Sequence, residues 1–337
     1  MLSSNSETKL NRVLAKVYGG ENPLSQVAEK RIAEFRKRAE SSKTIEPYSN
    51  FMEFPKQFSS YTPIMDSNGK KVVGGGYFLV INGRGCVIDP GHHYLSNYFN
   101  LKRTIKDIDA VFVTHFHDDH YADLPALLSL LYRRSKVDNN MSIDLFLDNE
   151  SYNMFSPIVN SAFYLSHPSN PISQGNVYKL RNEDDIIIEY LPTDHDVFGR
   201  RDADYGLHFH KIREDLSLII TGDTTWSDDI DEFYHKKFHD SGSYKVLVAH
   251  ISSIYENEGA FVGASQLEIE PNWHPNHLAI GGLCRCIAAC QPNKVVLSEI
   301  GEELEGIIDK IGEIVADVYN VDVSIGRLGN TIFLDRE

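Results

Sequence analysis

A short segment, residues 115–120, brings together three histidines and two aspartates directly after an apolar, strand-like run. Because side chains alternate along an extended chain, His115 and His117 point to one side, where both imidazoles can bind a single ion. Asp119 and His120 lie where the chain turns toward a helix, so they could serve a second ion nearby. The alternative, an ordinary solvated polar loop, does not readily explain why three histidines follow directly after a buried strand. We therefore predict a metal centre here.

The pattern His-x-His-x-Asp-His in this segment resembles the signature of the metallo-β-lactamase superfamily, and the resemblance extends from about residue 72 to the C-terminus. This resemblance implies that His195, in a loop after a strand-like run, is the third ligand of the first ion. His208 and His210 compete for this role, but they lie within a strand-like run rather than a loop. It also implies that Asp223, in a Gly-Asp-Thr sequence after another strand, bridges two ions.

The resemblance continues toward the C-terminus with one departure. His250 and His277 fall where transfer-RNA-processing members of the superfamily have histidines close to the active site and to the scissile phosphate. The last strand of the family normally ends in a metal-binding histidine, but Glu299 stands there in this chain. Either Glu299 binds the second ion, or His277 does and Glu299 supports it from outside. Asp89 matches an early aspartate that supports the ligands.

The resemblance implies two divalent ions that share a water molecule and lower its pKa, so that hydroxide forms near neutral pH. Asp119 would bind the second ion and orient this hydroxide, and His277 and His250 are candidates to protonate the leaving group. Zinc is the expected metal. Because Glu299 puts a carboxylate in the place of an imidazole, the second site would also suit manganese or iron.

Three functions are compatible with such a centre. The first is a metal-dependent phosphodiesterase that acts on a small nucleotide or a short nucleic acid. The second is a lactonase or another carboxylic ester or amide hydrolase, for example on a sugar-phosphate lactone. The third is a non-catalytic metal-binding sensor, which the apparently complete ligand set disfavours because structural sites are usually single and closed.

The elements that must position this centre alternate between strands and helices, which indicates an α/β architecture. Together with this alternation, the resemblance to the superfamily predicts a four-layer αββα sandwich over residues 51–337, preceded by a helical extension over residues 1–50. From Leu24 to Phe35, apolar residues recur at helical spacing, and we expect this face to pack on the catalytic domain rather than on a second subunit. The main predicted strands are 76–81, 85–88, 110–114, 143–147, 186–191, 205–209, 216–221, 245–249, 294–298 and 331–334; the helices are 121–134, 278–290 and 303–318.

The composition narrows the partners. With 33 basic and 48 acidic residues, the formal net charge is −15. Such a surface disfavours long nucleic acid, whereas a small anionic substrate held by a metal remains compatible with it. No stretch reaches the ~18 consecutive apolar residues that span a bilayer, and neither the N-terminal residues nor the four cysteines resemble those of a secreted protein. We therefore expect a cytoplasmic protein without a membrane partner, and a homo-oligomer is left open.

Overall fold

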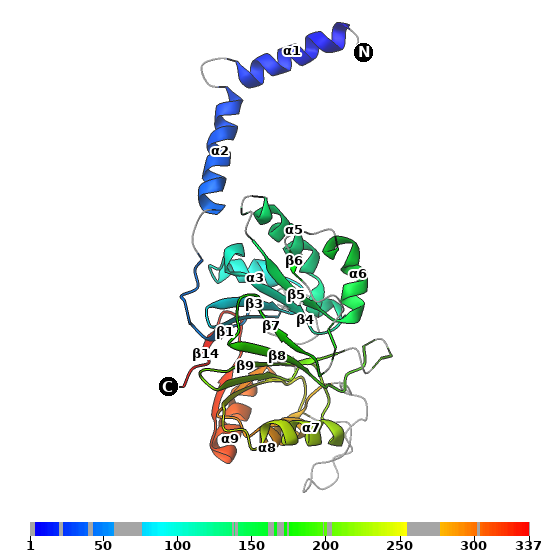
Figure 1. Ribbon diagram of the computed structural model, residues 1–337, viewed down its shortest axis with the longest axis vertical. Helices are drawn as coiled ribbons and strands as arrows, with labels where there is room; N and C mark the ends of the chain where they lie inside the picture. Colours follow the sequence, from blue (N-terminus) through cyan, green and yellow to red (C-terminus); the bar gives the residue numbers. More distant parts are fainter. Residues whose placement is uncertain are drawn as a thin grey trace.

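The structure is a computed structural model that describes residues 4–19, 23–39, 43–56, 76–136, 138, 141–160, 165–166, 172–173, 175–197, 199–200, 204–254, 277–301 and 304–336. Two mixed β-sheets face each other in the centre of the molecule (Figure 1). The first has the order β14-β1-β2-β3-β4-β5-β6 and the second has the order β13-β12-β11-β10-β9-β8-β7.

The strands of the first sheet are β1 Phe51–Glu53, β2 Tyr77–Ile81, β3 Arg84–Ile88, β4 Ala110–Val113, β5 Ile143–Leu147, β6 Leu165–Ser166 and β14 Thr331–Phe333. Those of the second are β7 Val177–Lys179, β8 Ile186–Leu191, β9 Gly206–Lys211, β10 Leu216–Ile220, β11 Tyr244–His250, β12 Lys294–Ser298 and β13 Asp322–Ile325. The central strands consist mostly of buried Val, Ile, Leu and Phe, as expected for strands that are covered on both faces.

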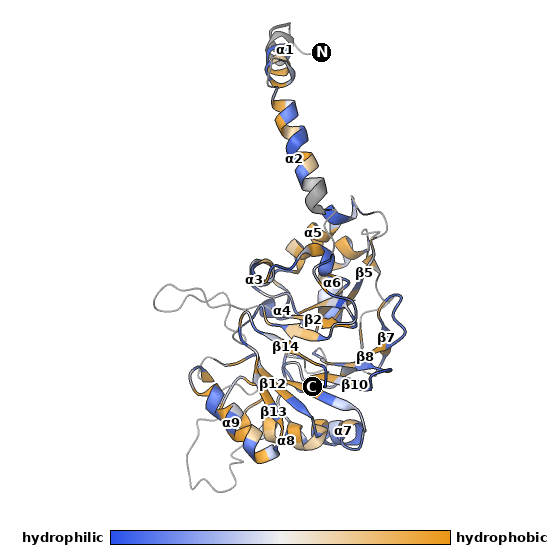
Figure 2. Cartoon of the chain, turned by 90° about the vertical axis from the view of Figure 1, so that its left-hand side faces the viewer, coloured by the Kyte–Doolittle hydropathy of each residue, from blue (hydrophilic) through white to orange (hydrophobic). Residues whose placement is uncertain are grey.

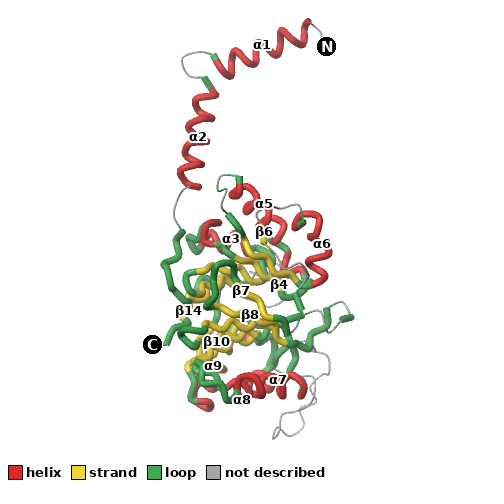
Figure 3. The backbone as a smooth tube through the Cα atoms, viewed as in Figure 1, coloured by secondary structure: helices red, strands yellow, loops and turns green. Residues whose placement is uncertain are grey.

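Helices cover the outer face of each sheet, whereas the inner faces pack on each other (Figure 3). On the first sheet lie α3 Tyr94–Asn100, the short helix η1 Ile105–Asp107, α4 Asp118–Tyr121, α5 Leu124–Ser135 and α6 Asn149–Val159. On the second lie α7 Asp228–Phe238, α8 Ile280–Cys290 and α9 Ile308–Tyr319. The layers are therefore helix, sheet, sheet and helix, and this confirms the predicted αββα sandwich.

Strand direction determines where the functional residues gather. In the first sheet β3 and β4 are parallel, and β1 is antiparallel to β2, which is antiparallel to β3. In the second sheet β10, β11 and β12 are parallel, and β8 is antiparallel to β9, which is antiparallel to β10. The carboxyl ends of β1, β3 and β4 therefore share one edge of their sheet, and those of β8, β10, β11 and β12 share one edge of the other. Ligand sites of open α/β sheets lie at such edges.

Most predicted strands are present with bounds shifted by a residue or two, but some predictions were wrong in detail. The helix predicted over 121–134 is divided into α4 and α5, because the chain turns at Ala122 and Asp123 and α5 begins with a proline in its first turn. The sequence patterns did not reveal β1, β6, β7 and β13, because these strands are short or show no clear alternation of buried and exposed residues. Glu303, the first residue of the last predicted helix, lies outside the described residues.

Two helices, α1 Ser4–Tyr18 and α2 Leu24–Ala39, extend away from the sandwich (Figure 2). Leu24, Val27 and Ile32 of α2 are about half exposed or more, so the expectation that this face packs on the catalytic domain was wrong for these residues. The two helices contact each other, and the ribbon of α2 leads away from both sheets (Figure 1). Residues 1–3, 20–22 and 40–42 of the predicted extension lie outside the described chain, and the boundary at residue 50 remains a prediction.

No helix within the described residues combines the length and the apolar character that crossing a membrane requires.

The interface between the sheets is expected to dominate stability. Phe112 is fully buried, stacks on Phe146 at a ring-centroid distance of 4.7 Å and meets Phe209 edge-on at 5.4 Å. Phe112→Ala should lower the free energy of unfolding by about 3–5 kcal/mol, because it leaves a cavity between the layers. Phe333→Ala, at an edge side chain that is 65% exposed, should cost about 1 kcal/mol or less. Equal losses in urea titrations would contradict this account of the core.

A second stability prediction concerns the N-cap of α6. Asp148 accepts hydrogen bonds from the backbone N–H groups of Glu150 and Ser151, and burial raises its pKa from 3.8 to about 7. The raised pKa means that the folded state binds the proton of the Asp148 carboxyl group more tightly than the unfolded chain does. The contribution of Asp148 to the free energy of unfolding is therefore greatest at low pH and declines as the pH rises from about 4 to about 7.

Asp148→Asn keeps the cap and removes the titrating group. Between pH 5 and pH 8, wild type should lose roughly 2 kcal/mol of unfolding free energy relative to this variant. Urea titrations at the two pH values measure the difference. Parallel pH profiles for the two proteins would show that Asp148 is already ionised in the folded state.

Candidate metal centre

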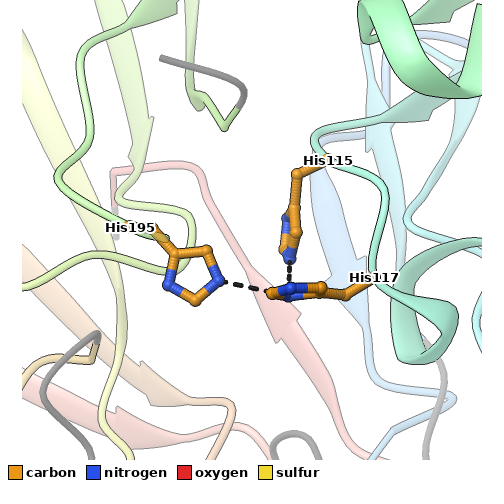
Figure 4. Close-up of side chains that lie close together, drawn as sticks. All are labelled: His115, His117 and His195. Carbon is orange, nitrogen blue, oxygen red and sulfur yellow. Dashed lines mark hydrogen bonds between the residues drawn. The ribbon is translucent and has the colours of Figure 1, made fainter. Parts of the chain in front are cut away.

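Three histidines converge at the end of β4 and at the end of β8 (Figure 4). His115 Nε2 lies 3.0 Å from His117 Nδ1, and His195 Nε2 lies 3.2 Å from the same atom. One ring nitrogen from each of the three residues falls within 4.8 Å of the others, so all three could bind one ion. The chain around His195 is held by backbone and side-chain hydrogen bonds between Asp194 and the segment after β10.

The competitors of His195 lie elsewhere. His208 is in β9, where its Nδ1 lies 2.9 Å from a Glu189 oxygen and its Nε2 lies 2.7 Å from Ser217 Oγ. These partners account for both ring nitrogens of His208. His210, in the same strand, lies beside His208 rather than beside His115 or His117. The structure therefore places His195, and neither of the strand histidines, beside the first two predicted ligands.

A second cluster surrounds His120. Its Nδ1 lies 3.0 Å from an Asp89 oxygen, and its Nε2 lies 3.3 Å from one oxygen each of Asp119 and Asp223. Asp223 also lies 2.9 Å from Nδ1 of His250 and 3.7 Å from Nδ1 of His277. Asp223 thus lies between the two clusters, which is the place that the sequence predicts for a bridging carboxylate.

Close backbone approaches make this arrangement possible. Asp89 has a φ of 52° directly after β3, and its carboxylate accepts hydrogen bonds from the backbone N–H and the hydroxyl of Thr114. A side chain at Gly91 would collide with the backbone oxygen of Asp119, because a Cβ there would lie 1.6 Å from it. Gly222 turns the chain at a φ of 67° after β10 and so brings Asp223 to the sheet edge.

Burial and neighbouring charges set the protonation of these groups. Burial lowers the pKa of His115 and of His117, and the imidazoles of His120 and His195 lower both further. Burial alone would raise the pKa of Asp119 and of Asp223, but nearby cationic groups, His120 among them, hold both below their ordinary values. Neutral imidazoles and ionised carboxylates are the forms that bind metal ions.

Glu299, which stands where the superfamily normally has a histidine, is paired with a lysine in the structure. Glu299 follows β12 with a φ of 50°, and its carboxylate forms an ion pair with the ammonium of Lys56, which follows β1. Neither oxygen of Glu299 accepts a hydrogen bond within the described part of the chain. One of these oxygens lies within 4.8 Å of ligand atoms of Asp223 and His250. Glu299 therefore faces the cluster, but it is paired with a cation of the protein itself.

Three residues at the site were missed by the sequence analysis. Lys56 is one, and Asp204 is another: its oxygen lies 3.2 Å from His115 Nδ1, and burial raises its pKa to about 8. The third is Tyr77, whose hydroxyl lies 2.8 Å from His250 Nε2. Residues of these types are common, and nothing in the neighbouring sequence distinguishes them from ordinary surface or core positions.

Both clusters contain groups that fit a divalent ion. Around His117, three imidazoles and the nearby carboxylate of Asp223 offer the donor set that zinc and similar ions bind in proteins. Next to it, ligand atoms of His115, His120 and Asp223 lie within 4.8 Å of one another, as do those of His195, Asp223 and His277. Glu299 is different, because its carboxylate is paired with the buried ammonium of Lys56.

Comparisons with known proteins agree with this geometry. A family model described as the metallo-β-lactamase superfamily matches residues 74–131. The metallo-β-lactamase fold protein YhfI from Bacillus subtilis is 15% identical with a TM-score of 0.60, and the match covers 84% of this chain and 98% of that chain. The chain has the metallo-β-lactamase fold.

Two further solved structures share this fold with the chain. Human tRNase Z, short form, is 13% identical with a TM-score of 0.58, over 85% of this chain and 100% of that chain. A diphosphatase from the PhnP family is 12% identical with a TM-score of 0.54, over 84% of this chain and 96% of that chain. No curated protein sequence gives a significant match. The fold implies divalent metal ions, and the histidine and aspartate clusters of this chain could hold them.

The placement of His195 gives a direct test. His195→Gln should weaken binding of a divalent ion by at least about 100-fold, because it removes one of three converging imidazoles. His208→Gln is the matched control, since His208 lies in β9 with Glu189 and Ser217 as partners. Titration with zinc in a competitive chelator measures both affinities. If His208→Gln were the variant that loses the ion, the assignment of the first cluster would be wrong.

Proposed function

We propose that this protein is a metal-dependent hydrolase that cleaves a phosphodiester bond in a small nucleotide or a short nucleic acid. The observation that carries this proposal is the position of His277. Its side chain is 10% exposed and its Nδ1 lies 3.7 Å from the central carboxylate of Asp223. His115 and His120, by contrast, are fully buried. His277 is thus placed to reach a substrate while remaining next to the centre.

An ion at the first cluster would be held by His115, His117 and His195 with the carboxylate of Asp223. When bound, it would supply a water molecule of lowered pKa as the nucleophile. Asp204 fixes the ring of His115 through Nδ1, and this leaves Nε2 directed at the cluster. Thr114 Oγ1 lies 3.2 Å from Nδ1 as well, so two neighbours hold the ring of His115 in place.

The remaining groups are suited to proton transfer and charge stabilisation. Asp223 lies beside both His250 and His277. Burial lowers the pKa of His250 even though the carboxylate of Asp223 opposes this effect. His277 would donate its proton to the leaving oxygen, because it is the more exposed of the two. His250 is fixed between Asp223 and the hydroxyl of Tyr77, and its role would be to hold the carboxylate in place.

Zinc is the metal that a site with three imidazoles favours, and manganese or iron would be favoured by additional carboxylates. The sequence predicts two ions with a shared hydroxide. Within the described residues, ligand atoms of His115, His120 and Asp223 lie close enough together to hold a second ion, as do those of His195, Asp223 and His277.

The substrate class is supported by the names of two structural neighbours. One is a tRNase and the other is a diphosphatase, and both names denote cleavage at phosphorus. The net charge of −15 opposes a long polyanion and favours a small anionic substrate that the local positive charge of the centre attracts. A lactone or another carboxylic ester is the alternative substrate, since the same nucleophile would attack a carbonyl carbon.

Hydrolysis of a generic phosphodiester, bis(p-nitrophenyl) phosphate, tests the proposal with zinc-loaded and manganese-loaded protein. Asp119→Ala should lower kcat/KM by about 100-fold or more, because it removes a buried carboxylate beside His120. Asp118→Ala is the matched control: the neighbouring side chain is 66% exposed, and its loss should change kcat/KM by less than about threefold.

The opposite results are equally informative. Cleavage of a lactone but not of the phosphodiester, with the same dependence on Asp119, would replace the phosphodiesterase by a lactonase. A protein that retains its metal and cleaves neither substrate would be a metal-binding sensor.

A further inference from the structure

Two apolar surfaces of the chain face the solvent. The first lies on the N-terminal arm, which we define as α1 and α2. Its exposed large apolar residues are Val13, Leu14, Tyr18, Leu24, Val27 and Ile32. The second surface lies along α9, where Ile307 is 41%, Ile314 is 53% and Val318 is 69% exposed. Together the two surfaces contain half of the large hydrophobic side chains that are exposed in the described part of the chain, and exposed apolar patches mark interaction sites.

The surface along α9 is hollowed into a groove against α8. A cavity of about 280 Å³ lies there, and the nine residues that line it are all uncharged. Ile311, Ile314 and Val318 line it from α9, at the spacing that places residues on one face of a helix. The hydroxyl of Tyr319, which also lines the groove, donates a hydrogen bond to the backbone oxygen of Cys284. The groove therefore favours an apolar partner, and grooves of this kind receive the apolar face of a helix.

The helix α2 is complementary to this groove in pattern and in charge. Apolar residues recur at helical spacing from Leu24 to Phe35, and Arg31 lies on the same face, about two turns after Leu24. The helix carries five basic and two acidic residues, although the whole chain has a net charge of −15. The helix α9 carries three acidic residues and one basic residue, and Asp317 is exposed next to Val318. An apolar, basic helix thus matches an apolar groove with an acidic rim.

The α2 helix of the same chain is tethered too far from the groove to lie along it. Lys43 forms an ion pair with Asp109, and Ile45 is buried in the core between the first sheet and its helices. From Ala39, the last residue of α2, the chain can span at most roughly 14 Å to Lys43. The groove lies on the helices of the second sheet, and the outer layers of such a sandwich are about 30 Å apart. The α2 helix that fits the groove is therefore that of a second copy.

We propose that the protein forms a two-fold dimer in which α2 of each copy lies in the groove between α8 and α9 of the other. The arm lies at one end of the molecule, and α8 and α9 lie at the opposite end (Figure 1). A two-fold axis across the long dimension therefore brings each arm beside the groove of the other copy. Both pairs of apolar surfaces are then covered, and the contact closes on itself instead of propagating into a filament.

Sedimentation equilibrium of the full chain tests this proposal, and wild type should be a dimer at micromolar concentration. Val27→Glu in α2 and Val318→Glu in α9 should each weaken dimerisation by about 100-fold or more, because each variant places a carboxylate in the apolar interface. Val177→Glu is the matched control. This valine of β7 is 57% exposed, compared with 52% for Val27 and 69% for Val318, and its replacement should leave the dimer intact. Because all three side chains are exposed in the single chain, each variant should fold, which circular dichroism verifies.

Mixing the two weakened variants distinguishes an exchange of arms from other arrangements. A mixed dimer of Val27→Glu and Val318→Glu retains one unaltered arm in one unaltered groove, so the equimolar mixture should form dimers at concentrations where neither variant does alone. If mixing restores no dimer, the arms are not exchanged between copies. If Val318→Glu remains a dimer, the groove is not covered by the arm, and the proposal is wrong.

A monomeric wild type would also overturn the proposal. In that case the arm would serve another purpose, and binding of the monomer to vesicles that contain anionic lipids would identify the basic, apolar face of α2 as a membrane-surface contact. None of these measurements involves turnover or bound metal, so their outcome is independent of the proposed hydrolase activity.

Discussion

Four carboxylates, those of Asp89, Asp119, Asp223 and Glu299, are buried together where the edges of the two sheets meet, each no more than 5% exposed. Like charges at such a depth repel one another strongly and cannot all remain ionised without compensating cations. His120 supplies part of the compensation, Lys56 another part, and a metal ion beside His117 would supply the rest. The composition of the site follows from this requirement of charge balance.

The fold meets the requirement by assembling distant residues at one place. Lys56, Asp89 and the 115–120 segment follow strands of the first sheet, whereas His195, Asp223, His250 and Glu299 follow or end strands of the second. Because the strands concerned run in the same direction within each sheet, all these side chains emerge at one edge. The rigid core between the sheets then holds imidazoles and carboxylates within hydrogen-bonding distance before a metal or a substrate binds.

The sequence alone determined the fold class and the segment that begins the site, because both depend on local patterns: apolar strands at regular intervals, and histidines two residues apart at a strand end. It also revealed that a glutamate stands where a histidine is usual. Only the tertiary structure decided what that glutamate contacts, since Lys56 and Glu299 are 243 positions apart in the chain and meet only because the two sheets pack face to face. For the same reason the supporting roles of Asp204 and Tyr77, and the exposure of the apolar residues of α2, were not readable from the sequence: each depends on which elements pack together, and no local pattern encodes that.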